Sequence, residues 1–220
     1  MAHSPDQIQA SSEQNPASNQ PILSARNDSP PPLSRQLPQL PHQYIAAVIK
    51  PSVATFTKSI ENASWSLVWV QLLAWAILDA LLGELVNLLY PPATGSFALQ
   101  LFSLASSIGL IFVVPLLFFL LMGIVYLLAK AFGGQGTFLQ QCHSSLQIQV
   151  PLGIMSKILA LIPLVGRILN SILSLYGIGV QVVVIMAVHR LSRGKAIAVL
   201  LIPVVGIAVF TGAFFLLTRK

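Results

Sequence analysis

Apolar residues form long, nearly unbroken runs along most of this chain, instead of the alternating faces that a soluble helix shows. The first such run covers residues 64–90 and reads SWSLVWVQLLAWAILDALLGELVNLLY. A helix of about 27 residues would be about 40 Å long, which is enough to cross a hydrocarbon core of about 30 Å. Because the segment is apolar on nearly every side, the pattern predicts a membrane span that begins with tryptophans.

Further apolar runs follow the same pattern. Residues 97–132 are too long for one perpendicular crossing, so we expect an in-plane or projecting first part and then one span, kinked near Pro115. Residues 133–149 form the only long polar stretch between apolar runs, and we interpret them as a loop. The sequence therefore predicts an all-α integral membrane protein, a five-span helical bundle with spans at about 66–88, 109–130, 150–166, 168–188 and 196–217.

The residues before the first span divide into two parts. Residues 1–42 are rich in Pro, Ser and Gln and carry too few apolar side chains for a core, so we expect a disordered cytoplasmic tail. Residues 43–63 have apolar faces and suit one or two short juxtamembrane interfacial helices, divided near Pro51. The membrane domain is thus predicted to cover residues 43–217.

Composition and charge support the membrane class. The chain is 55% hydrophobic and only 8% charged, with a mean hydropathy of +0.79, whereas globular domains carry about 25% charged residues. The net charge of +6 indicates membrane orientation and affinity for anionic lipids rather than nucleic-acid binding. Five spans with a cytoplasmic N-terminus place most basic residues inside, but six would move Lys130 and the cluster at 190–195 outside, so five is the better account.

Two carboxylates, Asp79 and Glu84, lie within the first predicted span. An ionised group at the centre of a span costs about 2.5–3.5 kcal/mol, so each needs a partner or a wet cavity. By depth, Lys157 is the expected partner of Asp79, and Arg167 that of Glu84. We interpret both as charge pairs that clamp the first span to the third, and the alternative is a proton or ion site in a transporter.

The remaining polar residues give weaker signals. His189, Arg190, Arg193 and Lys195 form either a patch for lipid phosphates or a partner, or a topology anchor. The single cysteine, Cys142, excludes an intrachain disulfide, and with His143 alone beside it no metal site is expected. No serine has a nearby base, so the sequence predicts no catalytic, cofactor or metal site and no enzyme.

Four segments, taken in order, carry a resemblance to a known family. They are FGGQGTF at 132–138, IPLVG at 162–166, the helix containing Tyr176, and AVHRLSRGKAIAVLLIP at 187–203. FGGQGTF is not a phosphate loop, because no Lys-Ser/Thr follows it, and its glycines are expected to supply positive backbone dihedrals for a turn. The set resembles the Yip domain family (Ypt-interacting proteins) over about residues 42–217. YIAAVIKPSVATF and the Trp-rich first span are similar to its prokaryotic branch.

The resemblance implies a five-span bundle with a cytoplasmic N-terminus. Eukaryotic members bind prenylated small GTPases of the Rab class and act in membrane traffic and shaping. We therefore expect a non-enzymatic scaffold or organiser of membranes and membrane proteins, in the plasma membrane if prokaryotic and in the ER or Golgi if eukaryotic. Expected partners are the lipid bilayer with its anionic lipids, other membrane proteins or a second copy, and a small GTPase only in a eukaryote. The alternative is a small transporter or channel that uses Asp79 and Glu84.

Overall fold

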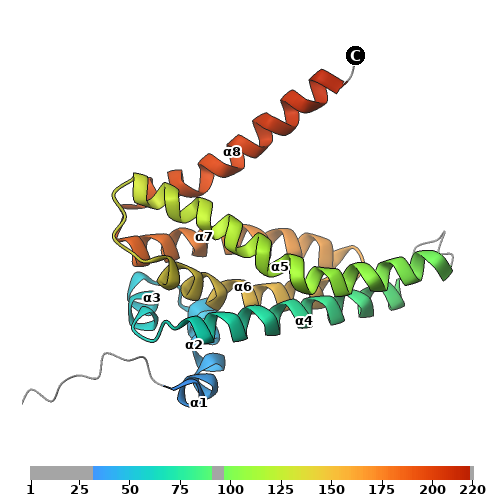
Figure 1. Ribbon diagram of the computed structural model, residues 1–220, viewed down its shortest axis with the longest axis horizontal. Helices are drawn as coiled ribbons and strands as arrows, with labels where there is room; N and C mark the ends of the chain where they lie inside the picture. The colour runs from blue at the N-terminus through green and yellow to red at the C-terminus, as the bar shows by residue number, and fades with distance from the viewer. Residues whose placement is uncertain (1–31, 91–96, 219–220) are drawn as a thin grey trace, which may run out of the picture.

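The computed structural model describes residues 32–90 and 97–218, and every regular element in these residues is a helix (Figure 1). The short elements are α1 (Leu33–Gln36), the 3-10 helix η2 (Leu37–Gln39), α2 (Leu40–Ile49) and α3 (Val53–Ile60). The long helices are α4 (Trp65–Leu89), α5 (Phe97–Ala131), α6 (Phe138–Ala160), α7 (Val165–His189) and α8 (Arg193–Thr218). The all-helical prediction is confirmed for the described part of the chain.

Local signals in the sequence fix where these helices begin. The side chain of Ser52 accepts a hydrogen bond from the Thr55 amide at the start of α3, and Ser64 does the same for the Leu67 amide at the start of α4. Such caps satisfy backbone amides that have no partner within the helix. Pro51 separates α2 from α3, as predicted, because proline disfavours helical backbone in the residue before it.

Three of the long helices are long and apolar enough to cross a membrane: α4, residues 108–131 of α5, and α7. No further candidate was found among the residues whose side chains the structure describes, which include only the first part of α8, so the five-span prediction is not confirmed. In α6 the reason is its first half, which is polar. Residues 97–131 form one continuous α-helix that contains Pro115, instead of a separate first part and a span.

Three predicted boundaries are wrong. The stretch 133–149 is not a long loop, because α6 already begins at Phe138 and ends at Ala160, and Gly166 and Arg167 lie in the first turn of α7. Residues 33–39 are helical although they fall in the predicted disordered tail. Gln36 is buried there, and the Ser64 hydroxyl donates to its side-chain oxygen at 3.4 Å. The rest of the predicted tail, residues 1–31, lies outside the described residues.

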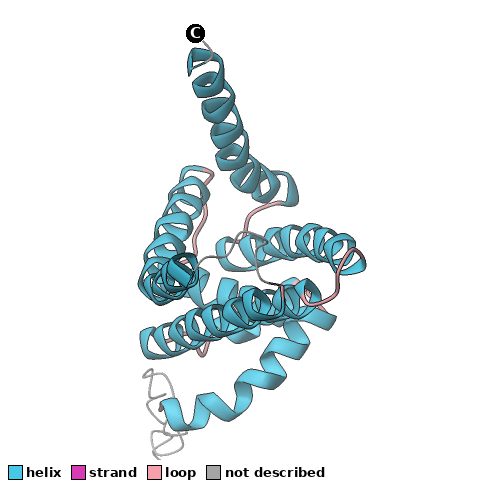
Figure 2. Ribbon diagram, turned by 90° about the vertical axis from the view of Figure 1, so that its right-hand side faces the viewer, coloured by secondary structure: helices cyan, strands magenta, loops and turns pink. Residues whose placement is uncertain are grey.

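The buried apolar residues gather in three clusters around α6 and α7. One joins α2 and α3 to α6 and α7, a second joins α4 and α5 to α6, and a third joins α5 and α7 to the start of α8. Helix α6 is therefore surrounded, whereas α8 leaves the other helices after its first turns and leads away from them (Figures 1 and 2).

The FGGQGTF segment makes the tight turn between α5 and α6. Gly133 has φ +89°, the left-handed conformation that favours glycine, as predicted. Gly136 lies so close to α7 that a Cβ there would be 2.5 Å from both Cγ1 and O of Val188. The Gln135 amide donates to the carbonyl of His189 at 3.1 Å. The segment thus holds the end of α5 and the start of α6 against the end of α7.

Candidate functional site

The first half of α6 is a polar helix inside the protein. Thr137 and Gln140 form a reciprocal capping box at its start. The polar side chains that follow have 1% or less of their surface exposed: Gln141, His143, Ser144, Ser145 and Gln147. Sequence reasoning missed this helix because polarity alone suggested a loop, although the Thr-x-x-Gln capping signal was present.

His143 is the centre of one hydrogen-bond network. Gln71 Nε2 of α4 lies 3.5 Å from its Nδ1, and Gln147 Nε2 lies 3.1 Å from its Nε2, so both ring nitrogens have an amide neighbour. Gln147 also donates to Gln43 Oε1 of α2 at 2.9 Å, and the Tyr44 hydroxyl donates to Gln71 Oε1 at 3.1 Å. The network joins α2, α4 and α6 around one buried imidazole.

Burial raises the pKa of the Tyr44 hydroxyl, which lies in α2, to about 12, so this group stays protonated at pH 7 and can donate its hydrogen bond to Gln71. Among the described residues, no group of three or more His, Cys, Asp or Glu side chains is arranged to hold a metal ion.

A second set of contacts joins α6 to α5 and α7. His189 Nε2 donates to Gln141 Oε1 at 2.7 Å, and Gln141 Nε2 donates to the carbonyl of Met122 at 2.9 Å. Gln181 Nε2 of α7 donates to Ser145 Oγ at 2.8 Å. His189 is fully buried and points inward, so it does not belong to the exposed patch that the sequence suggested.

The other members of that patch lie on the surface. Arg190 follows α7, Arg193 and Lys195 lie in the first turn of α8, and all three are exposed. Arg190 adopts left-handed backbone at the end of α7, and Lys195 Nζ donates to the carbonyl of Phe132 at 3.1 Å. Lys195 therefore also helps to fix the end of α5.

The structure brings Asp79 of α4 and Lys157 of α6 together. Lys157 Nζ lies 3.2 Å from Asp79 Oδ2, with 33% and 23% of the two side chains exposed. Gly83 lies beside the amine, and a Cβ there would make an ordinary van der Waals contact with Lys157 Nζ at 3.7 Å. Glu84 makes a contact of its own within the structure, but the structure records no ion pair between it and Arg167, which is exposed.

A cavity of about 280 Å³ adjoins this ion pair. It lies between α4, α5 and α6, and its lining includes Asp79, Gly83, Asn87, Leu110, Lys157 and Ala160. The two charged groups thus border a space rather than packed hydrocarbon.

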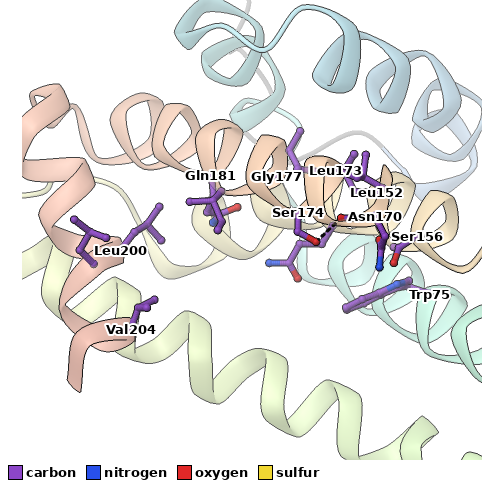
Figure 3. A pocket seen from close by; sticks show the side chains of 15 residues that line it. Trp75, Leu152, Ser156, Asn170, Leu173, Ser174, Gly177, Gln181, Leu200 and Val204 are labelled. Carbon is purple, nitrogen blue, oxygen red and sulfur yellow. Dashed lines mark hydrogen bonds between the residues drawn. The ribbon is translucent and has the colours of Figure 1, made fainter. Parts of the chain in front are cut away.

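A larger cavity, of about 470 Å³, lies between α4, α6, α7 and α8 (Figure 3). Leu200 and Val204 of α8 face Gln181 of α7 across it, and Trp75 lies toward its other end near Ser156. Its walls are mainly apolar. It exists because α8 diverges from the bundle and does not fill the space beside α7.

The comparison with protein families agrees with this arrangement. A family model described as the Yip1 domain matches residues 45–215, from α2 to near the end of α8. The chain belongs to the Yip1 domain family. Together with the three apolar helices, this membership makes it an integral membrane protein. Neither a search of the curated proteins nor a search of the solved structures found a match, so the polar helix and the ion pair of this Yip1 domain are described from this structure alone.

Proposed function

We propose that this Yip1-domain protein is a non-enzymatic organiser of membranes or membrane proteins that acts through helix and lipid contacts. The observation that carries the proposal is the course of α8, which leads away from the other helices (Figure 2). Leu201, Ile202, Val204 and Val205 are 45–61% exposed, and at 100° per residue they cover a wide arc of the helix. This surface has the apolar character that favours lipid or another membrane helix.

Site-specific crosslinking tests the proposal. A photoreactive amino acid at Ile202 or Val205, activated in native membranes, should yield a discrete adduct with another membrane protein or a second copy. The matched control is Leu116 of α5, an equally apolar and exposed position, where only lipid adducts are expected. Lipid adducts alone at all three positions would contradict a role in organising proteins.

We further propose five crossings with the N-terminus in the cytoplasm. The lengths of the helices support this, since the shortest of the five, α6 with 23 residues, measures about 35 Å. Its polar half is covered by α2, α3, α4 and α7, so it need not face lipid. In a Cys142→Ser background, single cysteines at Ser34 and Thr218 should react with an impermeant maleimide from opposite sides. Reaction from the same side would require an even number of crossings.

The exposed cations Arg190, Arg193 and Lys195 would then lie on the cytoplasmic side, where anionic lipid favours them. The plasma membrane is the proposed location in a prokaryote, and the ER or Golgi in a eukaryote. Only in a eukaryote does the proposal add a prenylated small GTPase as partner.

A second candidate function is transport, and the cavity beside Asp79 favours it. In that case the carboxylate would exchange its lysine partner for a proton or cation. Asp79→Asn in proteoliposomes should then abolish ion-dependent flux while the protein remains folded. If the unmodified protein shows no flux and Asp79→Asn only lowers thermal stability, the result would support the organiser function instead.

A further inference from the structure

A polar cavity of about 500 Å³ lies between α2 and α3, away from the ion pair and from α8. It is at the open end of the hairpin that these two helices form, opposite the bend at Pro51. Its lining residues are Pro38, Gln39, His42, Gln43, Ala46, Thr55, Lys58, Ser59, Asn62 and Gln147. Eight of these ten residues are polar, which distinguishes this cavity from the apolar one beside α8.

The charges around the cavity have one sign. Among the described residues that line it, Lys58 is the only permanently charged side chain, and none of them is a carboxylate. The nearest acidic residue in sequence, Glu61, precedes Asn62 but does not contribute to the described wall. An anion would therefore meet the ammonium of Lys58 and no carboxylate of this lining.

The hydrogen-bonding groups of the lining are available. The side chains of Gln39, His42, Lys58 and Asn62 make no hydrogen bond or ion pair within the described part of the chain. The floor is fixed, because Gln147 is 1% exposed and holds Gln43 through a 2.9 Å hydrogen bond. Donors without a protein partner above an anchored floor suit a ligand with several acceptor oxygens.

We propose that this cavity binds a phosphate group that carries a small polar substituent. Lys58 supplies the positive charge that faces the phosphate, while the imidazole of His42 and the amides of Gln39 and Asn62 bind its oxygens or the hydroxyls of the substituent. The volume is within the range of about 300–1,000 Å³ for small-molecule sites, and thus leaves room for more than phosphate. The source is either a lipid headgroup or a soluble phosphate compound.

The lipid source has a structural basis on the same hairpin. Ile45, Ile49 and Val53 are 43–69% exposed and follow the hairpin toward its bend. A phospholipid with its headgroup in the cavity would have apolar surface for its chains along α2. The site does not depend on the organiser function, since it is occupied whether or not α8 has a protein partner.

The test uses the full chain in phosphatidylcholine nanodiscs. In one arm inorganic phosphate is titrated and followed by calorimetry. In the other, phosphatidylglycerol is added to the nanodiscs and its binding is measured by native mass spectrometry. Lys58→Gln and Asn62→Leu should each weaken binding by about tenfold or more, the usual effect of losing a charge-assisted or buried hydrogen bond. Lys58→Arg keeps the positive charge and should retain most of the binding affinity.

Lys50→Gln is the matched control, because Lys50 is an exposed lysine of the same hairpin that does not line the cavity. Phosphate and phosphatidylglycerol binding by Lys50→Gln should change by less than about twofold, because the variant removes a surface charge outside the site. Saturable binding of phosphate supports a soluble ligand, and binding of phosphatidylglycerol alone supports a headgroup. Equal losses for Lys50→Gln and Lys58→Gln, or no saturable binding in either arm, would overturn the proposal. Unchanged melting temperatures exclude misfolding as the cause of a loss.

Discussion

Removing one partner of the Asp79–Lys157 pair should destabilise the protein more than removing an exposed charge. Asp79→Asn leaves Lys157 without its partner at 3.2 Å. An uncompensated charge at the centre of a span costs about 2.5–3.5 kcal/mol. The side chains are 23–33% exposed and border a cavity, so screening reduces that cost, and we expect about 2 kcal/mol. For a chain of 220 residues this corresponds to about 4–8 °C in melting temperature.

The assay is thermal unfolding in detergent for a double-mutant cycle. Asp79→Lys and Lys157→Asp should each lower the melting temperature, while the exchanged pair should recover most of the loss, with a coupling energy of about 1–2 kcal/mol. Arg167→Gln, an exposed cation at the start of α7, is the control and should change stability by less than about 0.5 kcal/mol. Additive losses in the exchanged pair would refute the clamp.

Two further predictions concern α6 and its turn. Gly136→Ala should cost about 1–3 kcal/mol in a melting assay through its clash with Val188, whereas Gly109→Ala, with no atom within 4 Å, should be neutral or stabilising. Thr137→Ala should cost about 1 kcal/mol by loss of the capping box, measured as a lower denaturation midpoint.

The sequence predicts the elements that depend on local chemistry or on uniform apolarity. The membrane class, the helical fold and the family follow from the apolar runs and the ordered motifs, and the bend at Pro51 follows from backbone sterics. The predicted depths of Asp79 and Lys157 in the membrane, counted along their two spans, were enough to anticipate that they lie close together. Apart from that pair, for which depth in the membrane was the guide, each of these features can be read from one segment without knowing what packs against it.

The features that sequence reasoning missed all depend on neighbours far along the chain. A run such as Gln141–Gln147 is typical of a solvated loop unless other helices cover it, and those helices come from residues 40–60, 65–89 and 165–189. The direction of His189 is likewise set by its partner Gln141, which is 48 positions away. Periodicity describes one helix at a time and carries no information on either point.

The polar half of α6 explains why so many elements gather at one end of the bundle. A buried polar group without a partner costs about 1–3 kcal/mol, and this half-helix buries two amide, two hydroxyl and one imidazole side chain. Gln71, Gln43 and Gln181 reach it from α4, α2 and α7, so each surrounding helix meets α6 at one register. Lipid offers no equivalent partner, and displacing any of these helices would leave polar groups facing hydrocarbon. The network therefore fixes the register of α2, α4 and α7 against α6 at this end of the domain.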